Sequence, residues 1–222
     1  MYTSVIIPAL NEAKNLRRCV ASIGGLCEVI IADGGSDDNT REVTKSLGAK
    51  FISCKRGRGE QMDTAAKTAK GDVLLFLHAD TTLPPDWLTA VKNAFGDEHA
   101  VGGAFMLDID SKKTSLRLIA ALARLRSRLL GLTYGDQAIF ARKTTFMEAG
   151  GFNKLPLMED VDCVKRLKAK GRFVLLNERV TTSPRRWEER GAVANTVKNI
   201  RLLALYLAGA KPERLYKFYY RR

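Results

Sequence analysis

The sequence of 222 residues predicts an α/β protein in which helices flank a central, mostly parallel β-sheet. Its first half alternates short β-branched segments with longer amphipathic ones, which is the pattern of a doubly wound sheet. The short segments are apolar almost throughout, as strands are when helices cover both faces of a sheet. No internal repeat or linker interrupts the pattern, so we expect a single domain over residues 1–222.

The individual elements follow from this alternation. In the first half we expect strands at 4–8, 28–33, 51–53 and 72–77, and helices at 12–23, 41–47, 60–70 and 85–95. The second half is less regular. There we expect strands at 100–108, 137–141 and 172–176, and helices at 115–132, 159–170 and 192–208.

Composition restricts the partners and the compartment. The chain has 37 Lys and Arg against 24 Asp and Glu, a net charge of +13, which favours an anionic partner such as nucleotide phosphates, nucleic acid or an acidic membrane surface. Its four scattered cysteines form no CxxC pair and indicate reduced thiols. The beginning of the sequence lacks a signal-peptide pattern, and no apolar run is long enough to span a bilayer, so we expect a cytoplasmic protein.

Carboxylates follow three of the expected strands. Glu12 lies just after the first, Asp33 ends the second, and Asp80 closes the fourth. Ligands of open α/β sheets bind beyond these carboxyl ends, and clustered carboxylates repel each other unless a cation or donors lie between them. The set predicts a site for a metal ion and a nucleotide. Each piece also has a structural interpretation, as a helix N-terminus, a tight turn or an N-cap.

Two of these segments suggest specific ligands. Asp80 supplies a hard oxygen of the kind that Mg²⁺ or Mn²⁺ uses to bridge a diphosphate, with His78 either a second ligand or, as we favour, a packed neighbour. The loop at 56–61 places two arginines and two glycines before a helix, and either binds an anion or is a solvated basic loop. The usual phosphate-loop and dinucleotide motifs are absent.

An acidic turn opens the helix expected at 159–170. Helical spacing puts Glu159 and Asp162 on similar faces and Asp160 on another, with Asp162 within reach of Arg166. Either Asp160 enters a cleft while its neighbours serve structure, or the whole turn complements the helix dipole.

Taken in order, eight segments resemble the family-2 inverting glycosyltransferases of the GT-A (Rossmann-like) fold. They are Pro8-Ala9-Leu10-Asn11-Glu12, residues 33–40, the loop 56–61, His78-Ala79-Asp80, residues 102–105, Gly150-Gly151-Phe152, Glu159-Asp160 and Arg185-Arg186-Trp187. The strings LHAD, YGDQ, LMEDVD and SPRRW most resemble a small bacterial branch named for its association with radical-SAM or selenium-related genes.

The resemblance implies a role for each matched residue. The donor, a UDP- or GDP-sugar, would contact Pro8, Leu10, Glu12, Asp33, Gly35, Arg58, Gln61 and Asp80. Asp80 would also bind the divalent cation cofactor, Mg²⁺ or Mn²⁺. Near the acceptor and the leaving diphosphate would lie Glu159, Arg186 and Trp187. Residues 1–98 would form the nucleotide-binding half and residues 99–222 the acceptor-side half.

The implied reaction is a single displacement. Asp160, as general base, would take the proton of an acceptor hydroxyl that attacks the anomeric carbon, while the metal ion and an arginine stabilise the departing diphosphate. The sequence departs from the family pattern at His78, in place of the first Asp of the DxD motif, and at Ser183, in place of the Gln of QxxRW. The alternatives are a nucleotide-sugar-binding protein without catalysis, a peripheral membrane-binding protein and a sugar-phosphate nucleotidyltransferase.

The segment at 115–132 and the last twelve residues are basic. The first places Arg117, Arg124 and Arg128 on one helical stripe with leucines opposite, and the second interleaves basic and aromatic residues. Either they pack on the domain with a solvated face, or they form a patch on the inner face of a membrane that presents a lipid-linked or lipophilic acceptor. No nucleic-acid-binding motif accompanies the charge, so we expect no nucleic-acid partner.

Overall fold

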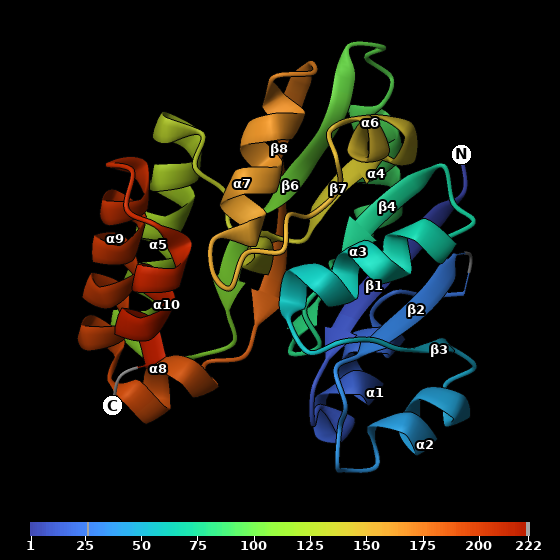
Figure 1. Cartoon of the computed structure of the whole chain (residues 1–222), viewed down its shortest axis with the longest axis horizontal. Coiled ribbons are helices and arrows are strands. Elements are labelled where there is room, and N and C mark those ends of the chain that lie inside the picture. The colour runs from blue at the N-terminus through green and yellow to red at the C-terminus, as the bar shows by residue number, and fades with distance from the viewer. Residues whose placement is uncertain (26, 221–222) are drawn as a thin grey trace.

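A computed structural model describes residues 1–25 and 27–220, and it confirms the α/β fold (Figure 1). Its strands are β1 (Thr3–Ala9), β2 (Glu28–Asp33), β3 (Lys50–Ser53), β4 (Val73–Phe76), β5 (Thr81–Thr82), β6 (Ala100–Ile109), β7 (Ile139–Arg142) and β8 (Arg172–Thr182). They form one sheet in the order β3-β2-β1-β4-β7-β6-β8-β5. The sheet is mostly parallel, as expected, because only β5 and β7 run against their neighbours.

The helices cover both faces of this sheet. They are α1 (Ala13–Ala21), α2 (Thr40–Ser46), α3 (Arg58–Thr68), α4 (Trp87–Ala94), α5 (Thr114–Leu130), α6 (Lys143–Glu148), α7 (Glu159–Lys168), α8 (Arg185–Arg190), α9 (Ala192–Leu207) and α10 (Pro212–Tyr220), with a 3-10 turn at Gly135–Gln137. Residues of α1, α2 and α4 share one buried cluster, and residues of α3, α6 and α7 share the other.

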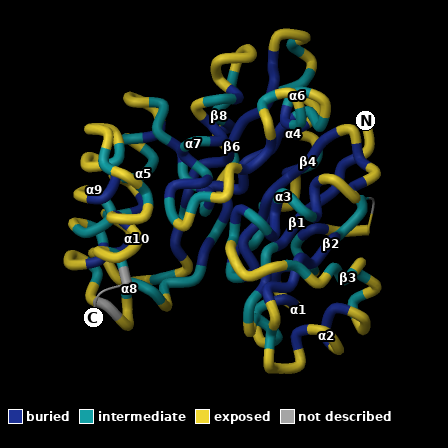
Figure 2. Tube along the Cα trace, in the orientation of Figure 1, coloured by how far each residue is buried: buried dark blue, intermediate teal, exposed yellow. Residues whose placement is uncertain are grey.

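The strands are buried on both sides, as the apolar segments predict (Figure 2). The alternation along β1 shows how, since Ile7 belongs to the cluster under α1 and α4 and Ile6 to the cluster under α3 and α7. Both side chains are fully buried. A strand with two apolar faces can lie only in the middle of a layered sheet, and β1 lies between β2 and β4.

The elements expected up to residue 95 are present with ends that differ by at most two residues. The second half differs more. β8 continues to Thr182 instead of ending at residue 176, and the chain before β7 forms a 3-10 turn. Elements β5, α6, α8 and α10 were not expected. Within the described part of the chain, no helix combines the length and the apolar character needed to cross a membrane.

The C-terminal helices pack next to the start of α7. Leu202 and Leu203 of α9 and Leu215 of α10 are buried in one cluster with Met158 and Val161. In Figure 1, α5, α9 and α10 lie side by side at the end of the molecule away from β3. The carboxyl ends of β1 and β4 therefore face a helical wall contributed by the second half of the chain.

Candidate functional site

A cavity of about 660 Å³ lies beyond the carboxyl ends of β1 and β4. Most of the residues that the sequence indicated as functional line this cavity, and they come from segments as distant as β1 and α8. Those that line it are Pro8, Leu10, Glu12, Arg58, Gln61, Asp80, Glu159, Asp160 and Arg186. Asp33, Gly35 and Trp187 are not among the lining residues.

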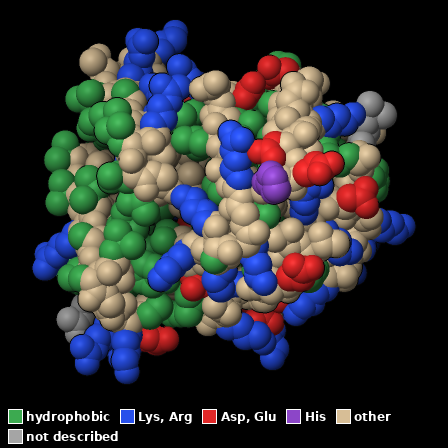
Figure 3. Space-filling model, turned by 90° about the horizontal axis from the view of Figure 1, so that it is seen from above, with side chains coloured by type: hydrophobic (Ala, Val, Ile, Leu, Met, Phe, Trp, Pro, Cys, Tyr) green, Lys and Arg blue, Asp and Glu red, His purple; other side chains and the backbone are tan. Residues whose placement is uncertain are grey.

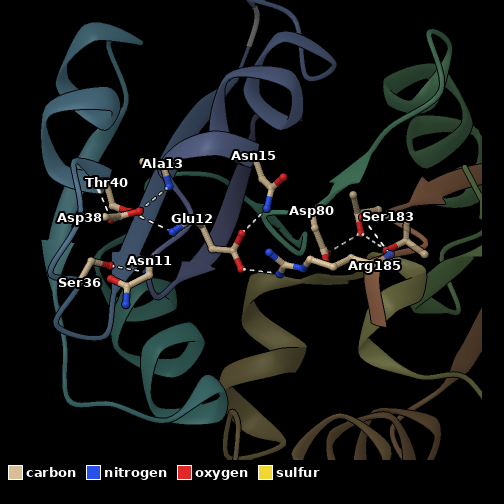
Figure 4. A network of polar contacts seen from close by, with 12 residues as sticks. Asn11, Glu12, Ala13, Asn15, Ser36, Asp38, Thr40, Asp80, Ser183 and Arg185 are labelled. Atoms are coloured by element: carbon tan, nitrogen blue, oxygen red, sulfur yellow. Dashed lines mark hydrogen bonds and ion pairs between the residues drawn. The ribbon is translucent and has the colours of Figure 1, made fainter. Parts of the chain in front are cut away.

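The loop after β1 is fixed by the loop after β2 (Figure 4). Asn11 has a left-handed backbone with φ of 58°, a conformation that Asn tolerates well. Its side-chain oxygen accepts the N–H of Asp37, and its own N–H donates to Ser36, both at 2.8 Å. Glu12, one residue on, forms an ion pair of 3.4 Å with Arg185. The carboxylate of Glu12 thus connects the first strand to the turn after β8.

Asp33 and Gly35 line a neighbouring hollow of about 480 Å³ instead of the main cavity. The carboxylate of Asp33 accepts the N–H groups of Gly35 and Ser36, each at 3.0 Å, so it shapes its own loop. The same hollow contains the ring of Phe51, over which the guanidinium of Arg41 lies 5.3 Å from the centroid. It therefore offers an aromatic ring and a carboxylate beside the ends of β2 and β3.

Gln61 holds the ends of two strands together. Its buried amide nitrogen donates to the carbonyl oxygens of Ala9 at 2.8 Å and of Ala32 at 2.7 Å. Arg58, one turn earlier on α3, forms an ion pair of 3.8 Å with the buried carboxylate of Glu159. The start of α3 therefore lies between the strand ends and α7.

The residues after β4 provide one buried and one accessible polar group. His78 is buried, and its Nε2 has no hydrogen-bond partner among the described residues. Burial, with the positive charges of Arg58 and Arg186, holds the pKa of His78 well below its usual value, so its ring is neutral. Asp80 lies next to the turn after β8, where its carbonyl accepts the N–H of Ser183 at 3.0 Å (Figure 4).

The protein alone offers few metal ligands. The described residues contain no group of three or more His, Cys, Asp or Glu side chains placed to hold a metal ion. Asp80 nevertheless lines the cavity with a carboxylate. A single carboxylate fits Mg²⁺ or Mn²⁺ that takes its remaining ligands from diphosphate oxygens and water, and it does not fit a protein-enclosed zinc site.

A short loop holds Asp160. The N–H of Gly135 donates to Oδ2 of Asp160 at 2.5 Å. A Cβ at Gly135 would lie 3.1 Å from that oxygen and 3.2 Å from Nε2 of His78, so only glycine fits there without displacing its neighbours. The loop itself is anchored by Gln137, whose buried amide donates to the carbonyl of Phe105 at 2.9 Å and accepts from Ser127.

Asp136 lines the cavity beside this loop, although no role for it was expected from the sequence. Among the described residues its buried Oδ1 has no hydrogen-bond partner, and burial raises the pKa of Asp136 against the opposing charge of Arg126. Tyr134 also lines the cavity, with the guanidinium of Arg126 3.9 Å from its ring centroid. The YGDQ string was the available signal for both residues.

The three carboxylates in the first turn of α7 are not arranged as helical spacing predicted, with Glu159 beside Asp162 and Asp160 apart. Glu159 and Asp160 both line the cavity at the start of α7, which begins directly after Met158, a residue with φ of 67°. Burial raises the pKa of Glu159, the charge of Asp160 raises it further, and Arg58 opposes both effects. Asp162 lies outside the lining and pairs with Arg166 at 2.8 Å, the structural contact expected from the sequence.

Arg186 and Trp187, in the first turn of α8, lie in different environments. Arg186 lines the cavity. Trp187 packs instead against a small cluster formed by Ile109, Leu116 and Ala120, between β6 and α5. The structure therefore brings Trp187 to the helical layer and not to the lining of the cavity.

One end of the cavity is largely apolar and was not anticipated. Its residues come from the loop before α7 and from α9 and α10, namely Leu155, Pro156, Leu157, Met158, Asn199, Leu202, Tyr216 and Tyr219. Aromatic residues interleaved with basic ones near the end of the chain were the signal for the two tyrosines. The cavity thus has a charged end at the sheet and an apolar end under the C-terminal helices.

Comparison with known proteins adds similarities in sequence and structure. The model of glycosyl transferase family 2 matches residues 4–153. A PGL/p-HBAD biosynthesis glycosyltransferase of Mycobacterium tuberculosis is 30% identical over 206 residues, which cover 87% of this chain and 79% of the relative.

Two solved structures have a similar fold. TarS 1–349 of S. aureus in complex with UDP-GlcNAc has a TM-score of 0.65 at 18% identity, over 82% of this chain and 58% of its own. The mannosyltransferase PcManGT from Pyrobaculum calidifontis, in complex with GDP-Man and Mn²⁺, has a TM-score of 0.64 at 17% identity, over 81% and 56%. This chain spans less than two thirds of either structure, and at these identities the likeness concerns the fold alone, which is GT-A.

Proposed function

The chain belongs to glycosyl transferase family 2, and from that premise we propose that it transfers a sugar from a nucleotide donor to an acceptor hydroxyl by one inverting displacement. One observation carries the proposal. A single cavity brings the accessible carboxylate of Asp80 together with that of Asp160, and it includes three arginines, Arg56, Arg58 and Arg186. Those are the groups needed to bind a diphosphate and to accept a proton.

We propose a UDP- or GDP-sugar as the donor. The GT-A neighbours were solved with UDP-GlcNAc and with GDP-Man, which supports this class and leaves the choice to experiment. The diphosphate would lie at the charged end, beside Asp80 and Arg186. We assign the base and ribose to the hollow formed by Asp33, Arg41 and Phe51, where an aromatic ring can stack on a base and a carboxylate can accept from a hydroxyl.

Asp80 would hold the divalent cation, and a bound Mg²⁺ or Mn²⁺ would neutralise charge on the diphosphate. The Mn²⁺ in the PcManGT complex supports this assignment. Arg58 and Arg186 contribute positive charge in the same cavity, so the chain's own residues also favour a departing diphosphate.

Asp160 would be the general base. As the acceptor oxygen forms its bond to the anomeric carbon, the bond from that carbon to the diphosphate breaks and the acceptor proton passes to Asp160. The N–H of Gly135 fixes the position of Oδ2. Oδ1 accepts the N–H of Val161 at 2.8 Å, so the side chain is held from both oxygens.

The apolar end of the cavity supports a lipophilic or lipid-linked acceptor. Leu157, Leu202 and Tyr216 are among the residues that line it. A fully buried Leu-sized group gains roughly 1.5–3 kcal/mol on transfer from water, which is enough to make the acceptor's apolar part decide selectivity.

Calorimetric titration of the purified protein with UDP, GDP and their sugars tests the donor site, in Mn²⁺, in Mg²⁺ and in EDTA. One nucleotide sugar should bind in a metal-dependent manner, and Asp80→Ala should weaken it by at least roughly tenfold, since a charged ligand contact is lost. Asp160→Asn should leave binding intact but slow release of the nucleoside diphosphate by roughly 10²–10⁴-fold. Asp86→Ala, on the exposed turn before α4, is the matched control.

Three results would contradict the proposal. Absence of binding by any nucleotide to the folded protein would remove the donor site. Binding without turnover at any tested acceptor, unchanged by Asp160→Asn, would favour a nucleotide-sugar-binding protein. Release of pyrophosphate from a nucleoside triphosphate and a sugar phosphate would favour a nucleotidyltransferase.

A further inference from the structure

Helix α5 exposes a stripe of leucines. Positions 118, 122, 125 and 129 recur at the spacing of one helical face, and their side chains are 60%, 52%, 50% and 72% exposed. The opposite side of the helix is already packed, since Leu116 and Ala120 are buried against Ile109. The leucine stripe therefore faces solvent, although the sequence alone also allowed it to be a core face.

Helix α9 exposes a second stripe with the same spacing. Val193, Val197 and Ile200 are 72%, 58% and 58% exposed, and Leu207, two turns later, is 59% exposed. The other side of α9 is packed through Leu202 and Leu203. Each helix thus has two apolar sides, one used by the fold and one left at the surface.

The two stripes lie at the same end of the molecule, because α5 and α9 contact each other and lie side by side (Figure 1). Figure 3 shows hydrophobic side chains gathered at the end of the molecule where these helices lie, with Lys and Arg at the margin. We call this surface the α5–α9 face. It consists of Leu118, Leu122, Leu125, Leu129, Val193, Val197, Ile200 and Leu207. Large apolar side chains exposed together in this way usually mark a protein or membrane contact.

Charge distinguishes these two partners. The exposed arginines Arg117, Arg128 and Arg201 belong to the same two helices, and the chain carries a net charge of +13. A second copy on this face would present the same basic residues, so like charges would oppose each other across a symmetric interface. Anionic phospholipids attract the same residues, by roughly 1 kcal/mol for each Lys or Arg near the surface.

We propose that the α5–α9 face binds an anionic phospholipid membrane, with α5 and α9 lying in the plane of the headgroups. The inference rests on the proposed glycosyl transfer for its purpose. Asn199 and Leu202, on the other side of α9, line the apolar end of the cavity. A membrane under this face is therefore separated from the acceptor end of the cavity by one helix, which suits an acceptor that is itself anchored in lipid.

Co-sedimentation with vesicles tests the proposal on the whole chain. Wild type should bind vesicles of phosphatidylcholine with phosphatidylglycerol, and bind phosphatidylcholine alone roughly tenfold or more weakly, because the lipid charge is absent. Leu125→Ser with Val197→Ser should weaken binding by roughly a hundredfold, since two buried side chains are lost from the lipid.

A charge-matched pair provides the control. Arg117→Glu with Arg128→Glu on the face should weaken binding to the charged vesicles at least roughly tenfold. Lys14→Glu with Arg17→Glu, exposed on α1, changes the net charge equally and should bind like wild type. Equal losses in both pairs would overturn the proposal, because they would show attraction by net charge alone.

Light scattering and calorimetry separate the remaining outcomes. A wild-type dimer that Leu125→Ser with Val197→Ser converts to a monomer, together with no vesicle binding, would assign the face to a second copy and overturn the proposal. Donor binding, measured without lipid, should be the same in wild type and all face variants. If wild type binds no nucleotide sugar, the proposed function is contradicted, whereas the vesicle result still decides whether the face binds a membrane.

Discussion

The two walls of the cavity differ in how far their buried polar groups are hydrogen-bonded within the described part of the protein. The wall formed by the end of β1 with the start of α3 pairs its polar groups within the protein, as Gln61 does with the carbonyl oxygens of Ala9 and Ala32. The facing wall, formed by the end of β4, residues 134–136 and the start of α7, contains buried polar atoms without partners among the described residues. They are Nε2 of His78 and Oδ1 of Asp136.

This difference indicates which wall is shaped for rigidity and which for a ligand. Buried polar groups are almost always hydrogen-bonded, so each exception calls for an explanation. His78 and Asp136 both line the cavity, where ligand hydroxyls could supply the partners. The same wall contains Asp136 and Glu159, whose pKa values burial raises. Such groups concentrate at functional sites.

Replacement of the proposed base should have the largest effect. We expect Asp160→Asn to lower the rate of nucleoside diphosphate release by roughly 10²–10⁴-fold, with donor affinity unchanged. Asp162→Asn, two residues away and paired with Arg166 outside the cavity, is the control and should retain most of the rate. Similar losses in both variants would show that substitutions in this turn lower the rate by destabilising the protein. Asp160 would then not be the general base.

Gly135→Ala should displace the base without removing it. The new methyl group would lie 3.1 Å from Oδ2 of Asp160 and 3.2 Å from Nε2 of His78, closer than ordinary van der Waals contact, so these neighbours must move. A misplacement of about 1 Å can cost roughly a hundredfold in rate, and we expect a decrease of that order in kcat with a small change in donor Kd. Gly25→Ala is the matched control, because no atom of the described residues beyond its chain neighbours lies within 4 Å of a Cβ at Gly25. An unchanged kcat would show that the loop tolerates repositioning.

Gln61→Ala should weaken the opposite wall. It leaves the carbonyls of Ala9 and Ala32 without their donor, at a cost of roughly 2 kcal/mol in unfolding free energy. Denaturant unfolding measures it, and Glu60→Ala, which removes only a surface pair with Lys154, should cost much less. If the two variants were equally stable, the first wall would not depend on its internal pairing.

The first wall was the more predictable one from sequence. Its strand is apolar on both faces, and its polar residues follow the strand ends in chain order, so Glu12 and Gln61 could be placed by order alone. Even there, sequence did not separate the hollow of Asp33 from the main cavity. That separation depends on how the loop curls around the Asp33 carboxylate.

The second wall depends on contacts between distant segments. Asp160 meets Gly135 across 25 residues, and β5 pairs with Thr181 and Thr182 far along the chain. Two residues there have left-handed backbones, Ala138 and Met158, which neither side chain signals. Hydrophobic periodicity does not signal such features. The sequence therefore did not predict that Asp136, Tyr216 and Tyr219 line the cavity, and it predicted a position near the acceptor for Trp187, which does not line it.

The smallest predicted effect concerns the pH dependence of stability. Because burial raises the pKa of Asp136, the folded protein binds more protons than the unfolded chain between the ordinary and the raised pKa. The protonated form therefore contributes stability at acidic pH, and this contribution is lost as pH rises through the pKa of the folded protein. The loss is about 1.4 kcal/mol for each tenfold difference in proton affinity between the folded and unfolded chain.

Asp136→Asn removes this loss, so the melting temperature of the variant relative to wild type should rise from acidic to neutral pH. Glu98→Gln, at an exposed position, should show no such trend. A flat difference for Asp136→Asn would mean that the carboxyl is paired or solvated in solution, and the two walls would then be alike in how they satisfy their polar groups.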